Sequence, residues 1–202
     1  MIERYHTYTD YCATPAYQQW LGQWEPPQGD INWVDSEPEW WGRTPRYRMQ
    51  ERHGTRLVYH LLDTLAIGDQ RCVDIGCGHN PHQGLWGVDP HNERHRDELL
   101  TPEWYRHNWD QWAHAFTCNA LHFCDQDTLP HNIAKVRGIL RPGGTAVITI
   151  NRARVRDFTG PDFDPERLYA TLAQTPGMTR MVWIDEPQDA MMDGNVWIWL
   201  TK

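Results

Sequence analysis

The stretch VDIGCGHNPHQGLWGVDP, residues 73–90, restricts the fold more than any other part of the chain. A short apolar run ends in Asp74, two glycines follow at Gly76 and Gly78, and a second apolar run ends in Asp89. Only fifteen residues separate the two acids, so any helix between the two predicted strands is very short or absent. Acids at two strand ends with a glycine turn between them are typical of a ligand site at the edge of an open sheet.

The rest of the chain alternates strand and helix patterns. Apolar runs predict strands over residues 71–75, 84–89, 112–118, 145–151, 178–184 and 195–201. Helical spacing and helix-start signals predict helices over residues 45–66, 101–109, 127–140 and 164–175. This alternation predicts an α/β, Rossmann-like open twisted sheet, mostly parallel, with helices on both faces. No helix separates the last two strands, so we expect the last strand to run antiparallel.

The first 42 residues have a different composition from the remainder. They hold seven acidic residues and one arginine, and they are rich in tryptophan. We predict a Trp-rich acidic N-terminal arm over residues 1–42, without long helices or strands, and a folded domain over residues 43–202. The arm either packs its aromatic rings on the domain or serves as a lid or docking surface, with Trp33, Trp40 and Trp41 as candidate contacts.

Charge and cysteine usage exclude several classes of protein. The net charge of −8 argues against broad, non-specific binding to nucleic acid. The five cysteines are an odd number with no CxxC pair, which indicates neither a disulfide framework nor a zinc finger and favours the cytoplasm. The N-terminus lacks the apolar stretch of a signal peptide, and no apolar run approaches the length of a membrane span.

The glycine turn favours a cofactor without a pyrophosphate. A dinucleotide fingerprint needs a third glycine, and Pro81 discourages a long helix directly after the turn. A helix N-terminus for a pyrophosphate is therefore poorly supported, which argues against a nicotinamide-dependent oxidoreductase. Asp89, at the end of the second strand, is placed to accept two hydrogen bonds from ribose hydroxyls.

Four segments in order resemble class I S-adenosylmethionine-dependent methyltransferases, over about residues 45–202. VDIGCGHN is similar to the first motif of that family and GVDP to the second. WDQWAHAFTCNALHF resembles the fourth strand and the residues after it, and ILRPGGTAVITIN resembles the following helix, turn and fifth strand. The closing pair of strands also fits, because the last strand of that family inserts antiparallel.

This resemblance implies S-adenosylmethionine as the cofactor and a role for each matching position. The loop under the methionine part of the cofactor would be formed by Asp74, Gly76, Cys77 and Gly78. Asp89 would bind the ribose, and Asn119 would lie near the sulfonium and the acceptor. The shortened helix between the first two strands resembles small bacterial and phage-type members. No segment matches the third motif, so Asp97 and Glu98 are the candidates for contacting adenine.

The residues after the fourth predicted strand are candidates for chemistry. An acceptor that loses a proton needs a base, and His122 is the first candidate, with Asn119 beside the acceptor. Each also has a structural alternative, in which Asn119 caps a helix and His122 packs in its first turn. Methylation of DNA amino groups would need an (N/D)PP(Y/F) motif, and a cytosine-ring enzyme a proline before Cys118; neither is present. The expected acceptor is a small molecule or a protein.

Two other clusters have a structural and a functional interpretation. The segment NRARVR, residues 151–156, would be either an exposed basic loop or a site for an anionic acceptor. The histidines at positions 79, 82, 91 and 95 match no common zinc spacing, so we predict no metal site.

A different class of function stays open. A methyltransferase-like fold can serve as a structural or interaction subunit of a larger assembly, and the aromatic arm would then mediate self-association or binding to another protein. The intact acids and glycines favour the enzyme, because a scaffold has no need of them.

Overall fold

The computed structural model describes residues 1–24, 60, 71–77, 85–91, 97–118, 120–121, 124, 126–152, 155, 163–185 and 195–202. The strands are β1 (Ile2–Tyr5), β2 (Cys72–Ile75), β3 (Trp86–Asp89), β4 (Glu98–Leu99), β5 (Trp112–Cys118), β6 (Leu140–Asn151), β7 (Arg180–Asp185) and β8 (Asn195–Thr201). The helices are α1 (Tyr8–Cys12), α2 (Pro15–Leu21), α5 (Pro102–His107), α6 (Leu129–Ile139) and α8 (Pro165–Ala173).

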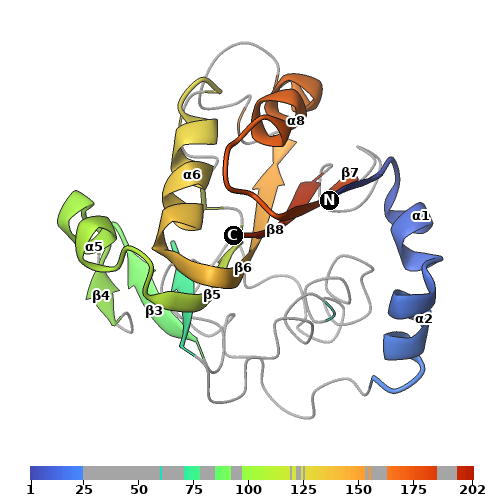
Figure 1. Ribbon diagram of the computed structural model, residues 1–202, viewed down its shortest axis with the longest axis horizontal. Coiled ribbons are helices and arrows are strands. Elements are labelled where there is room, and N and C mark those ends of the chain that lie inside the picture. The colour runs from blue at the N-terminus through green and yellow to red at the C-terminus, as the bar shows by residue number, and fades with distance from the viewer. Residues whose placement is uncertain are drawn as a thin grey trace, which may run out of the picture.

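These strands form one sheet in the order β1-β7-β8-β6-β5-β2-β3-β4 (Figure 1). Strand β8 lies between β6 and β7 and runs antiparallel to both, while all the other pairings are parallel. The predicted mostly parallel sheet with an antiparallel last strand is therefore confirmed. The carboxyl ends of seven strands and the start of β8 consequently share one edge of the sheet, here called the carboxyl edge.

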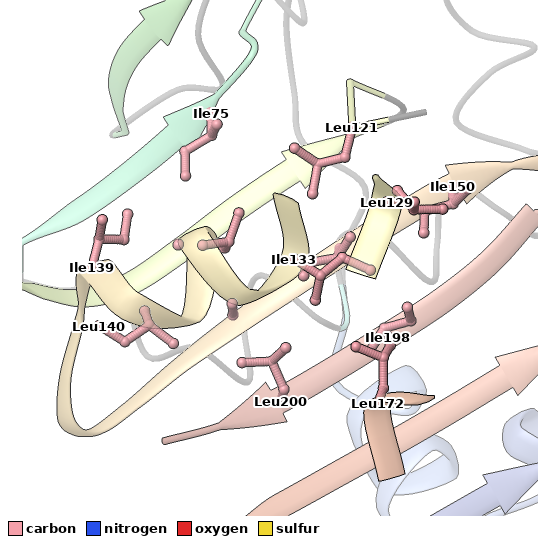
Figure 2. Close-up of a cluster of buried hydrophobic side chains, with 14 of the residues drawn as sticks. Ile75, Leu121, Leu129, Ile133, Ile139, Leu140, Ile150, Leu172, Ile198 and Leu200 are labelled. Atoms are coloured by element: carbon pink, nitrogen blue, oxygen red, sulfur yellow. The ribbon is translucent and has the colours of Figure 1, made fainter. Parts of the chain in front are cut away.

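Both faces of the sheet are buried, each in its own apolar cluster. Val73 and Ile75 face a large cluster with residues of α5, α6 and α8, and Ile133 of α6 packs at its centre (Figure 2). Tyr11 of α1 and Tyr17 of α2 belong to a second cluster with sheet residues of the opposite face. Alternate residues of a strand point to opposite faces, so near-continuous apolar strands are what a sheet covered on both sides requires.

Helix-start signals in the sequence correspond to observed caps. The Thr101 side chain accepts a hydrogen bond from the Trp104 N–H at 3.1 Å, and Pro102 opens α5. The Asp164 carboxylate accepts from the N–H groups of Glu166 and Arg167 at the start of α8. Each cap satisfies backbone donors that the helix itself leaves without partners.

Two edge strands were missed by the sequence patterns. Residues 2–5 of the predicted arm pair with β7, and two short helices follow them, so the first 24 residues are folded on the sheet. Strand β4 is only two residues long and pairs with β3. Residues 141–144, the turn expected between the predicted helix and the predicted strand, are instead part of β6. This strand begins directly after α6 and contains Gly143 at φ 76°.

The predicted helix over residues 45–66 lies outside the described residues except for His60. The backbone of His60 is helical, its ring is 3% exposed, and its Nε2 lies 2.9 Å from the Tyr11 hydroxyl oxygen. His60 also packs against the rings of Tyr17 and Trp20. Trp33, Trp40, Trp41 and the predicted boundary at residues 42/43 lie outside the described residues. None of the described helices is long and apolar enough to cross a membrane.

A partly buried histidine near the amino end of β5 gives a pH-dependent prediction. His114 Nδ1 lies 2.7 Å from the Thr145 hydroxyl, and Nε2 is buried without a hydrogen-bond partner. Burial, with a smaller contribution from Arg141, lowers the pKa of His114 below 6.5. The unfolded chain therefore binds a proton more readily, so this contribution to stability is present above pH 6.5 and is lost as pH falls through the folded pKa.

We expect His114→Asn to lose less stability than the wild type on acidification from pH 7 to pH 5. Urea unfolding at a series of pH values measures this difference. The same substitution at His131, an exposed position of α6, serves as the control and should leave the pH dependence unchanged. Parallel pH profiles for wild type and His114→Asn would contradict the prediction.

Candidate functional site

The order of the strands reverses at β2, which pairs with β3 on one side and β5 on the other. Since the chain passes from β2 to β3 and later returns to β5, the connections diverge at the carboxyl ends of β2 and β5. A crevice at this kind of switch point is where open α/β sheets bind ligands. The predicted site residues at positions 74–77 and 89 lie at or beside this point.

The turn after β2 is tied to the neighbouring strand. The N–H groups of Gly76 and Cys77 both donate to the Val88 carbonyl oxygen, at 2.7 and 3.2 Å. Gly76 has φ 70°, and a Cβ added to it would overlap the Cβ of Ala120, which follows β5. The absence of a side chain at Gly76 thus leaves room for Ala120, and the chain segments that follow β2 and β5 meet tightly beside β3.

Two buried carboxylates flank this turn. Asp89 is 7% exposed at the end of β3, and its Oδ1 accepts the His91 N–H at 3.0 Å. Its backbone oxygen accepts the Leu100 N–H at 2.9 Å, which joins β3 to the residue after β4. Asp74 is 1% exposed, in register with Phe116 of β5. The turn and the Asp89 carboxylate are thus held side by side by backbone hydrogen bonds.

The two candidates for contacting adenine are bonded within the protein. Asp97 Oδ2 accepts the Gly87 N–H at 2.7 Å, and Gly87 O accepts the Asp97 N–H at 3.1 Å. Glu98 accepts a hydrogen bond from the indole N–H of Trp104. These bonds hold the edge strand β4 and the first turn of α5 against β3.

The basic segment after β6 is not simply an exposed loop. The Arg152 side chain is 19% exposed and pairs with Asp185 at the end of β7. Asp185 also accepts from Arg4 of β1 at 3.3 Å, and Arg4 pairs in turn with Glu166 of α8. The Glu166 pair raises the pKa of Arg4 and lowers that of Glu166. Arg154 and Arg156 lie outside the described residues, as does any anion site that needs them.

Several other predicted positions also lie outside the described residues. They are Gly78, Asn119 and His122, together with the side chain of Cys118. The described residues contain no group of three or more histidine, cysteine or acidic side chains placed to hold a metal ion. A cavity of about 390 Å³ lies between the first turns of α6 and α8, where Arg167 and Asp127 form an exposed pair, and none of the predicted site residues lines it.

Two residues at the carboxyl edge were missed by sequence reasoning. Ala120 is one, and its small side chain beside Gly76 could be recognised only from the fold. Asn195 is the other: it opens β8, is fully buried, and finds no hydrogen-bond partner among the described residues for its side-chain oxygen or nitrogen. Its signal in the sequence is a polar residue at the head of the apolar run NVWIWLT.

Comparison with known proteins identifies the fold. No family model matches the sequence, and no curated protein matches it. Among solved structures, an S-adenosylmethionine-dependent methyltransferase from Archaeoglobus fulgidus is 14% identical with TM-score 0.50, over 72% of this chain and 93% of that one. The N-methyltransferase NodS from Bradyrhizobium japonicum WM9, in complex with S-adenosyl-L-homocysteine, is 14% identical with TM-score 0.50, over 94% and 99%.

A third structure, the CurJ carbon methyltransferase, is 17% identical with TM-score 0.48, and the match spans 72% of this chain but only about half (52%) of that one. At identities this low, the two matches with TM-score 0.50 show a shared fold and nothing finer. The chain therefore has the Rossmann-like fold of S-adenosylmethionine-dependent methyltransferases, which agrees with the resemblance of its motifs.

Proposed function

We propose that this chain transfers a methyl group from S-adenosylmethionine to a small-molecule or protein acceptor. One observation carries the proposal: the Asp89 carboxylate and the Gly76–Cys77 turn are fixed side by side at the point where strand order reverses. The methyltransferase fold supports it, and the complex of NodS with S-adenosyl-L-homocysteine makes that ligand the natural probe.

The described residues fit this cofactor chemically. Asp89 supplies acceptor oxygens at a strand end, as ribose hydroxyls need, and a backbone N–H already orients its carboxylate. Gly76 and Cys77, with Gly78 by resemblance, form the loop under the methionine part, and Asp74 is buried just before that loop. The turn lacks the third glycine of the dinucleotide fingerprint, so it suits a cofactor without a pyrophosphate better than it suits a dinucleotide.

Bound S-adenosylmethionine supplies a methyl group on a positively charged sulfur, ready for in-line displacement. The contribution of the chain is then to place the acceptor in line and to exclude water. Such positioning can lower a barrier by roughly 7–11 kcal/mol. We retain Asn119 as the residue beside the acceptor and His122 as the base that takes its proton, since they are the first and the fourth residues after β5 in the sequence.

We expect Asp89→Ala to weaken binding of S-adenosyl-L-homocysteine at least tenfold, or about 1.4 kcal/mol, because the ribose loses its carboxylate acceptor. Isothermal titration calorimetry measures the change, and thermal melting verifies that the variant is folded. Asp10→Ala, at an exposed position of α1, is the matched control and should bind like the wild type. Unchanged affinity in a folded Asp89→Ala chain would refute the role of Asp89.

Titration of the wild type with S-adenosylmethionine and with NAD tests the class of function. We expect heat with the first and none with the second. Absence of heat with both would favour the structural or interaction subunit, with the N-terminal arm as its binding surface. A cytoplasmic site of action also remains part of the proposal, supported by the odd number of cysteines and the lack of a CxxC pair.

A further inference from the structure

Asn195 occupies a distinctive place at the carboxyl edge. It is the first residue of β8, and because β8 runs antiparallel to its neighbours β6 and β7, its beginning lies where those strands end. Asn195 is in register with Asn151, the last residue of β6. Directly opposed residues of antiparallel strands have neighbouring side chains on one face, so two amide side chains lie together at this edge.

The side-chain amide of Asn195 is buried, but its polar atoms make no hydrogen bond to the described residues. It is 0% exposed, and within the described part of the chain neither Oδ1 nor Nδ2 has a hydrogen-bond partner. Buried amides in folded proteins nearly always have partners, and each exception calls for an explanation such as a bound water, an ion or a functional role. A carbonyl acceptor and an NH₂ donor, side by side and unused, are complementary to a group that presents the reverse pair.

The surroundings of Asn195 change from apolar to polar toward the carboxyl edge. Strand alternation places Asn195 on the same face as Trp197, which is 2% exposed and packs in the second apolar cluster. On β6, Val147 of that cluster is followed on the same face by buried Thr149 and then by Asn151. A flat ligand seated here would have aromatic and aliphatic side chains below it and amides around its edge.

The distance from the proposed cofactor site suits an acceptor. Strands β6 and β5 separate β8 from β2, so three strand spacings of about 4.8 Å, or about 14 Å in all, lie between Asn195 and the strand that carries the Gly76 turn. The methyl group must lie between the cofactor and the acceptor. Asn195 is therefore beyond the reacting centre, on the side away from Asp89 and β3.

We propose that Asn195 recognises the methyl acceptor, and that the acceptor carries a planar group with an N–H next to a carbonyl, as in a lactam, an imide or a primary carboxamide. This inference rests on the proposed function and specifies its substrate class. The Asn195 amide accepts from the N–H of that group and donates to its carbonyl. Asn195 is a specificity-determining residue in this scheme and takes no part in the displacement.

Two small probes that differ in one group test the proposal. The lactam 2-pyridone has the N–H and carbonyl pair, whereas 1-methyl-2-pyridone keeps the ring and the carbonyl but lacks the N–H. Each is titrated into the wild-type chain loaded with S-adenosyl-L-homocysteine, while ¹⁵N–¹H spectra follow the Asn195 side-chain NH₂, which is assigned by its absence from Asn195→Leu. We expect 2-pyridone to shift that signal and to bind at least tenfold more tightly than its methylated analogue.

The variant chain provides the second comparison. Asn195→Leu is nearly isosteric and removes two polar atoms that lack partners, so we expect a melting temperature equal to or above that of the wild type. It should bind S-adenosyl-L-homocysteine normally and bind the two pyridones equally. Asn132→Leu, on α6 at the opposite face of the sheet, is the control and should keep the preference for 2-pyridone.

The remaining outcomes overturn the inference. Equal binding of the two probes by the wild type, or no shift of the Asn195 signal, refutes it, and this comparison holds even if Asn195→Leu fails to fold. A lower melting temperature for Asn195→Leu with no discrimination by the wild type would assign the amide to a structural water. Failure of the wild type to bind S-adenosyl-L-homocysteine would refute the proposed function instead, so the two failures are distinguishable.

Discussion

Gly76→Ala will destabilise the fold by roughly 2–5 kcal/mol. Two costs add at this position. A left-handed backbone costs a residue with a Cβ about 1–2 kcal/mol, and Gly76 has φ 70°. Overpacking typically costs about 1–3 kcal/mol, and the new methyl would overlap the Cβ of Ala120. Urea unfolding measures the sum, and cofactor binding should fall with it because the turn must move.

Two further variants separate the costs. Gly143→Ala also places a methyl on a left-handed backbone, at φ 76°, but nothing lies within 4 Å of its Cβ, so only the backbone cost of about 1–2 kcal/mol is expected. In Gly76→Ala/Ala120→Gly the overlap is gone, and the nearest remaining atom is the Ala120 Cα at 3.7 Å. The double variant should therefore be more stable than Gly76→Ala alone. Equal losses for Gly76→Ala and Gly143→Ala would show that packing against Ala120 is unimportant.

The central strands could be predicted from the sequence because their signals are local. The runs at residues 112–118 and 145–151 are mostly apolar, and both form strands that are largely buried on two faces. Thr101 and Asp164, each followed by proline, mark helix starts by chemistry that acts within three residues. Such local patterns predict the order of strands and helices along the chain. Strands that alternate with helices in turn predict a parallel sheet.

The edges of the sheet could not be predicted in this way. Strand β1 has a partner on one side only, β7, which lies more than 170 residues further along the chain. Its sequence, IERY, alternates weakly and leaves most side chains partly exposed. Strand β4 has two residues, too few for any periodicity. Pairing with a distant strand makes these segments extended, and propensity contributes little.

The position of the candidate site in the sheet could be predicted from the sequence, but the contacts of its residues could not. Asp89 and Gly76 were selected because acids and glycines at strand ends suit a ligand, and the structure brings them together. The close neighbour of Gly76, however, is Ala120, whose contact depends on how β5 lies beside β2. Asn195 depends likewise on the insertion of β8 beside β6, which no local pattern reveals.

Asp185→Ala is expected to cost about 2–3 kcal/mol in free energy of unfolding, the second large effect. Its carboxylate lies between Arg4 and Arg152, and all three side chains are less than 20% exposed. Removing one member of a fully buried ion pair costs about 3–5 kcal/mol because a charge stays behind without compensation. The partial exposure of these side chains brings the expected value down. The loss would loosen the contacts of the end of β7 with β1 and with the residue that follows β6.

Asp127→Ala is the matched control, because it removes the same group from a pair with Arg167 in which both side chains are more than half exposed. Exposed pairs contribute less than about 1 kcal/mol, so this variant should be nearly as stable as the wild type. Replacing both Asp185 and Arg152, by leucine and methionine, should recover much of the loss, since Arg152 is then not left without a partner and Arg4 keeps its pair with Glu166. Equal effects of Asp185→Ala and Asp127→Ala would mean that burial adds nothing to the Asp185 network. A double variant no better than Asp185→Ala would show that the carboxylate acts through its contact with Arg4.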